Sequence, residues 1–184
     1  MRIERLKSHF PVKVKWVHFP LHPETPQAGV SIAELFAGRD IDMEAMYARM
    51  KDLMDGEGLP YSKRTHTFNS RLAQELGKWA DTQPGGDAIH DALFKAYFVE
   101  GRNIGDVEVL IEIAVSIDLS AVDARQVLSD RTFRAQIDAD WQKSRAYGIT
   151  GVPTFVAGGY GVVGAQPYEA LAQLVETVVA EQTG

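Results

Sequence analysis

The sequence contains no cysteine among its 184 residues. Disulfide bonds, thiolate nucleophiles and thiolate metal ligands are therefore excluded within this chain. Basic residues are outnumbered, with 19 lysines and arginines against 25 aspartates and glutamates, so nothing favours nucleic acid as a partner. No apolar run approaches the roughly 20 residues that a membrane-spanning helix needs, and the first residues have no apolar signal-peptide core. We expect a cytoplasmic protein that does not bind membranes.

The remaining composition is that of a globular protein. Hydrophobic residues make up 45% of the chain and charged residues 24%, which is enough apolar material for a real core. The length fits one domain, or one domain that carries an insertion.

Strand patterns occur only near the two ends of the chain. Residues 1–9 have the apolar spacing of a helix, and residues 12–19 alternate valine and tryptophan with lysine, which predicts a strand. Two further short strands follow Pro153 and flank Gly158-Gly159, a typical hairpin turn. A last helix is expected over 168–181.

The middle of the chain is predicted to be helical and is interrupted by glycine and proline. The expected helices cover 42–55, 70–80, 88–99, 107–117, 121–128 and 132–147. Since strands flank this block on both sides, we expect a discontinuous domain of residues 1–39 and 149–184 with a helical insertion domain at 40–148.

The most informative segment surrounds Pro153. Proline is tolerated at the first residue of a strand because it donates nothing to the ladder there. A cis Val152–Pro153 bond would turn the preceding backbone outward and leave an N–H and a C=O free to pair with an extended peptide. The alternative is an ordinary strand-initiating proline in a hairpin.

Two C-terminal motifs together resemble a known family. The runs Gly-Ile-Thr-Gly-Val-Pro-Thr-Phe at 148–155 and Val-Gly-Ala-Gln-Pro at 163–167 are similar to those of the DsbA-like thioredoxin-fold superfamily, in particular its FrnE-like cytoplasmic branch. The resemblance implies an α/β, thioredoxin-like fold with a large all-helical insertion. It also implies that the loop of Gly151, Val152, Pro153 and Thr154 binds a thiol- or disulfide-containing peptide or glutathione.

The chain departs from that family at its beginning. Family members open with a strand that delivers a Cys-Pro-x-Cys motif to the start of a helix, and Met1 falls inside that helix. The first strand of the fold and the cysteines are therefore missing, so we expect no catalytic residue and no redox activity in this cysteine-free form. We favour an internal methionine of a longer product, which predicts in-frame codons for a strand and Cys-x-x-Cys upstream. A strand supplied by a partner chain or another segment would also account for the gap, as would a natural degenerate form.

Three functions remain open at this stage. The first is membership of a thiol–disulfide oxidoreductase family. The second, implied by relatives on the same fold, is a glutathione-dependent isomerase or transferase of the 2-hydroxychromene-2-carboxylate isomerase or kappa class. The third is a non-catalytic peptide-binding module, for which a homodimer would cover the open strand edges.

The remaining polar and methionine clusters fit ordinary structural roles. His18, His22 and Glu24 straddle a strand end and a loop, so we expect no metal site and no cofactor. The row of Met43, Met46, Met50 and Met54 is expected to pack, although exposed methionines can line an adaptable groove.

Overall fold

The computed structural model describes residues 2–38 and 40–183. The chain forms two compact units, each with its own apolar core. One unit combines the chain up to Leu21 with the chain from Asp140 onward, and the other comprises His22–Ala139. These limits differ from the boundaries expected at 39/40 and 148/149. Which segments fold as separate domains stays a prediction.

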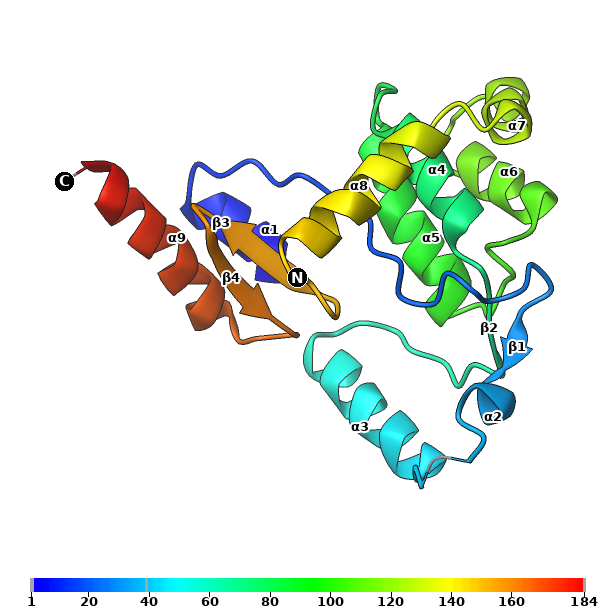
Figure 1. The fold of residues 1–184 in the computed structure, drawn as a ribbon, viewed down its shortest axis with the longest axis horizontal. Helices are drawn as coiled ribbons and strands as arrows, with labels where there is room; N and C mark the ends of the chain where they lie inside the picture. The colour runs from blue at the N-terminus through cyan, green and yellow to red at the C-terminus, as the bar shows by residue number, and fades with distance from the viewer. Residues whose placement is uncertain (1, 39, 184) are drawn as a thin grey trace. The chain divides into compact units, whose positions relative to one another are not determined.

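The unit that carries both ends is built around a β-hairpin. Its strands β3 (Thr154–Ala157) and β4 (Tyr160–Val163) pair antiparallel and contact helix α9 (Tyr168–Thr183) (Figure 1). Helix α1 (Arg2–His9) packs on α9. The core is formed by Leu6, Leu171 and Val175, with Phe155 and Val162 of the hairpin packed against it.

The strand predicted over residues 12–19 is not formed in the described part of the chain. A strand needs a neighbour for its backbone groups, and β3 pairs only with β4 within residues 2–38 and 40–183. At the end of the segment, side chains of helix α8 (Arg134–Ala146) take over this role. The N–H of His18 donates to Asp140 Oδ2 at 3.2 Å, and Ser144 Oγ donates to the His18 carbonyl oxygen at 3.3 Å.

The second unit is helical, as the sequence predicts. Its core lies among α4 (Arg71–Ala80), α5 (Ile89–Phe98), α6 (Val107–Val115) and α7 (Ala121–Asp130). The unit also contains α2 (Ile32–Leu35), α3 (Met43–Gly56), the 3-10 turn η1 (Gly86–Ala88), and a short antiparallel pair of β1 (Val30–Ser31) with β2 (His66–Thr67). The pair β1–β2 was not expected, because strands of two residues show no alternation.

Helix α3 has no buried residue, although its apolar side chains recur at helical spacing. Met46 and Met50 are 41% and 42% exposed, so the expectation that the methionine row packs is wrong for these two residues.

A buried carboxylate ties together the helices of the second unit. The Glu75 side chain is fully buried and accepts hydrogen bonds from Arg71 Nε and from Arg131 Nε and Nη2, each at 2.7 Å. Burial by itself raises the pKa of Glu75, but the hydrogen bonds and charges of Arg131 and Arg71 outweigh it and hold the pKa below its ordinary 4.5.

Replacing Glu75 tests this network. Glu75→Gln leaves two arginines without their shared buried anion, so we expect a loss of about 3–5 kcal/mol in the free energy of unfolding at pH 7, measured by urea denaturation. The matched control is Glu108→Gln, which removes a carboxylate that also binds one arginine, Arg125, at 2.6 Å but is exposed. That control should cost less than about 1 kcal/mol.

Acid should remove the same stabilisation from the unmodified protein. A carboxylate whose pKa is lower in the folded state stabilises the fold above its unfolded pKa and ceases to do so as the pH falls through the folded value. The stability difference between the parent and Glu75→Gln should therefore shrink below about pH 4.5. A difference that stays constant down to pH 2 contradicts a charged Glu75.

Candidate functional site

The hairpin has a tight turn that its two glycines make possible. The pairs run from Thr154 opposite Val163 to Ala157 opposite Tyr160, which leaves only Gly158 and Gly159 in the turn. Their φ angles are 56° and 88°, both in the left-handed region that two-residue hairpin turns require. The turn places the start of β3 beside the end of β4.

The loop before β3 is fixed by two hydrogen bonds. The Val152–Pro153 peptide bond is cis. The Gly164 N–H donates to the Pro153 carbonyl oxygen at 2.7 Å, and Thr154 Oγ1 donates to the Gly151 carbonyl oxygen at 2.7 Å. The four residues expected from the sequence therefore form one defined loop at the end of the hairpin.

Val152 lies at the exposed point of this loop. The residue is 51% exposed. Neither its N–H nor its C=O has a hydrogen-bond partner within residues 2–38 and 40–183. An extended peptide can pair its own backbone with an unpaired N–H and C=O on one exposed residue.

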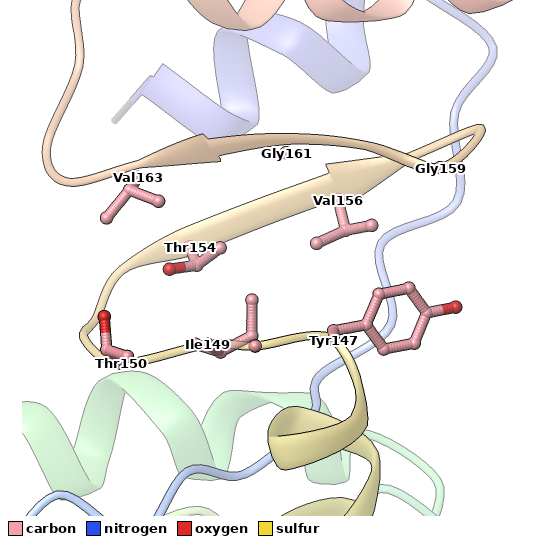
Figure 2. A pocket seen from close by; sticks show the side chains of 9 residues that line it. Tyr147, Ile149, Thr150, Thr154, Val156, Gly159, Gly161 and Val163 are labelled. Carbon is pink, nitrogen blue, oxygen red and sulfur yellow. The ribbon is translucent and has the colours of Figure 1, made fainter.

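A shallow cavity lies next to the loop. Its volume is about 180 Å³, and it is enclosed between the segment 147–150 and the outer face of the hairpin (Figure 2). The lining residues are Tyr147, Gly148, Ile149, Thr150, Thr154, Val156, Gly159, Gly161 and Val163. Of the four expected site residues, Thr154 lines the cavity, whereas Gly151, Val152 and Pro153 do not.

The side chains that line the cavity carry only hydroxyl groups and apolar groups. Tyr147, Thr150 and Thr154 bring hydroxyls, and none of the lining residues is a carboxylate, an imidazole or an amine. The cavity therefore offers no side chain suited to acid–base catalysis.

Helix α1 reaches the same end of the hairpin, which the sequence did not reveal. Arg2 Nη1 donates to the carbonyl oxygens of Ala165 and Gln166, at 2.8 and 2.7 Å. Gln166 Nε2 in turn donates to the Val163 carbonyl oxygen at 2.8 Å. The first turn of α1 thus lies beside residues 164–166. The N–H of Gly164 in this segment is the donor to the Pro153 carbonyl oxygen. No spacing pattern links Arg2 to residues more than 160 positions away.

The other candidates lie outside this site. His22 Nδ1 is 3.6 Å from Glu24 Oε1. In the described ranges, three histidine, aspartate or glutamate side chains nowhere gather closely enough to hold a metal ion. Likewise, none of the helices described is both long and apolar enough to cross a membrane.

Comparisons with known proteins give a consistent result. The model of the DSBA-like thioredoxin domain matches residues 1–176. A probable DsbA oxidoreductase from Streptomyces coelicolor is 30% identical and superposes with a TM-score of 0.88, over 98% of this chain and 82% of that chain. These two findings confirm the expected α/β, thioredoxin-like fold class.

Two further proteins are similar to this chain, over a shared fold or over part of the sequence. A 2-hydroxychromene-2-carboxylate isomerase shares the fold, with a TM-score of 0.69 and 18% identity over 99% of this chain and 87% of that chain. The uncharacterized protein YwbO from Bacillus subtilis (strain 168) is 32% identical over 95 residues. That match covers 51% of this chain and 48% of the curated relative, so the chain spans about half the length of that relative.

The turn that positions the loop can be tested at its two glycines. A Cβ atom at Gly158 would lie 2.6 Å from Val178 Cγ2 of α9, whereas a Cβ atom at Gly159 would meet nothing within 4 Å. Both substitutions incur the left-handed backbone cost of about 1–2 kcal/mol. Gly158→Ala should therefore lower the thermal midpoint of unfolding more than Gly159→Ala, and Val178→Ala should restore part of the difference. Equal midpoints for the two glycine variants would show that the hairpin does not pack on α9 as described.

Proposed function

The chain belongs to the DSBA-like thioredoxin domain family, and we propose that its loop of Gly151, Val152, Pro153 and Thr154 binds an extended peptide that carries a thiol or a disulfide. The observation that carries the proposal is Val152, an exposed residue whose N–H and C=O have no hydrogen-bond partner among the described residues. A peptide in extended conformation pairs with such groups through its own backbone.

The surroundings of Val152 support binding of a side chain next to the backbone contact. The cavity lies between Thr154, Val156 and Val163 of the hairpin and Ile149 of the preceding segment (Figure 2). A guest that pairs with Val152 can place a neighbouring apolar side chain there, and burial of such a side chain is favourable by roughly 25 cal/mol per Å² of apolar surface.

The chemistry of exchange needs a thiolate, which attacks a disulfide and forms a mixed disulfide. This sequence contains no cysteine, so the sulfur atoms for exchange at this loop come from the guest or from polypeptide outside these 184 residues. The function proposed for the chain itself is therefore binding and orientation. The FrnE-like branch and the cytoplasmic location expected from the sequence are part of the same proposal.

Glutathione is the second candidate guest. It is a short peptide with a thiol, and the likeness to the fold of a 2-hydroxychromene-2-carboxylate isomerase makes an isomerase-type role compatible with this chain. No residue that lines the cavity carries an acid or base group. This favours peptide binding over an enzymatic reaction on glutathione as the function of the site.

Thr154→Val tests the proposed loop. The substitution keeps the side-chain shape and removes the 2.7 Å hydrogen bond to the Gly151 carbonyl oxygen, so the loop loses its fixed geometry. Binding of a fluorescently labelled cysteine-containing peptide should weaken by roughly five- to tenfold, since one hydrogen bond contributes about 1 kcal/mol. Fluorescence anisotropy measures the change.

The matched control is Thr177→Val on α9, which removes a similar 2.8 Å bond to the Gln173 carbonyl oxygen. It should leave peptide affinity unchanged. A titration with reduced glutathione, and an insulin-reduction assay that is expected to show no turnover, complete the experiment. Peptide affinity equal in both variants and the parent would contradict the loop as the binding site.

A further inference from the structure

Residues 163–166, at the end of strand β4, form a tight turn that is closed by its own hydrogen bonds. Gly164 has a φ of 87°, in the left-handed region that glycine adopts most easily. The Gln166 N–H donates to the Gly164 carbonyl oxygen at 2.8 Å, and Gln166 Nε2 donates to the Val163 carbonyl oxygen at 2.8 Å. The Gly164 N–H is left to bind the Pro153 carbonyl oxygen, so the shape of this turn determines where the loop before β3 is held.

Arg2 of helix α1 supplies a contact that the turn does not make by itself. The carbonyl oxygens of Ala165 and Gln166 both accept from one nitrogen, Arg2 Nη1, at 2.8 and 2.7 Å. Two successive carbonyl oxygens that point at one place repel each other, and a positively charged donor between them offsets that repulsion. Hydrogen bonds from a charged donor are also stronger than those between neutral groups. Arg2 therefore stabilises the backbone shape that the turn has here.

Helix α1 is anchored by other residues than Arg2. Leu6 is buried in the core of this unit. One turn further along the helix from Arg2, Arg5 Cζ lies 3.7 Å from the centroid of the Tyr168 ring of α9. The packing of α1 on α9 therefore does not require the guanidinium of Arg2. Helix α1 serves as a fixed support from which this side chain reaches the turn, as a positioning group requires.

We propose that Arg2 is a positioning residue of the peptide-binding loop. It holds the turn at 163–166, and the Gly164 N–H of this turn holds the Pro153 carbonyl oxygen. The backbone of Val152 is thereby kept in the geometry that pairs with a guest. Affinity falls with the fraction of molecules that have the binding geometry, so a guest binds more weakly when Arg2 is lost. The part of this inference that concerns the guest rests on the proposed function.

The first measurement needs no guest. Arg2→Met keeps an unbranched side chain and removes the guanidinium, so the acceptor of the Gly164 N–H is held less firmly. Amide hydrogen exchange at Gly164 should become about three- to tenfold faster, whereas exchange at Phe155, inside the hairpin, should not change. Arg2→Lys should restore part of the protection, because it keeps a charged donor. The matched control is Arg5→Met, which removes a guanidinium of the same helix that contacts α9 and should leave exchange at Gly164 unchanged.

The second measurement is the affinity of the same variants for a labelled cysteine-containing peptide, followed by fluorescence anisotropy. The other residues of the peptide are uncharged, so the loss of a surface charge does not by itself change its attraction to the protein. Arg2→Met should weaken binding by about three- to tenfold. Arg2→Lys should lie between this variant and the parent, and Arg5→Met should bind like the parent.

The two measurements separate the role of Arg2 from the proposed function. A parent protein that binds no peptide contradicts the proposed function, whereas the Gly164 amide still reports on Arg2. Exchange at Gly164 that is equal in Arg2→Met and the parent, or that Arg5→Met accelerates as much, overturns the role of Arg2. Faster exchange in Arg2→Met together with unchanged peptide affinity overturns the step from the turn to the binding loop.

Discussion

The hydrogen bond from Gly164 N–H to the Pro153 carbonyl oxygen is the contact on which the site depends. It continues the register of the hairpin by one pair beyond Thr154 and Val163, and it holds the loop against the end of β4. The backbone polar groups of Pro153 and Phe155 point toward β4, so the N–H and C=O of Thr154 between them point away from β4. One register therefore determines which backbone groups of the loop and of β3 face away from β4.

The rest of the unit keeps that hairpin in place. Phe155 and Val162 pack on the core of Leu6, Leu171 and Val175, so one face of the hairpin is covered by α1 and α9. The opposite face carries Val156 and Val163 and borders the cavity. A hairpin alone is marginally stable, and packing on the two helices supplies what it lacks. The helical unit is stabilised separately, around its own core and the buried Glu75.

The sequence was informative where local chemistry decides the structure. Gly158-Gly159 predicted the hairpin turn, and both residues have the positive φ angles, 56° and 88°, that such a turn requires. The sequence was misleading for residues 12–19, because strand propensity does not say whether a neighbour is present. It also failed for Met46 and Met50, since helical spacing identifies an apolar face but not what covers it. The contact of Arg2 with Ala165 and Gln166 joins distant parts of the chain and leaves no local pattern.

The central claim is that the backbone of Val152 is an open pairing site for an extended peptide. The most direct measurement is a titration of the isotope-labelled protein with a cysteine-containing peptide, followed through the backbone amide resonances. The account predicts that the Val152 amide shifts first and most, together with Thr154 and Gly164. Binding that leaves Val152 unchanged while amides elsewhere shift would contradict it.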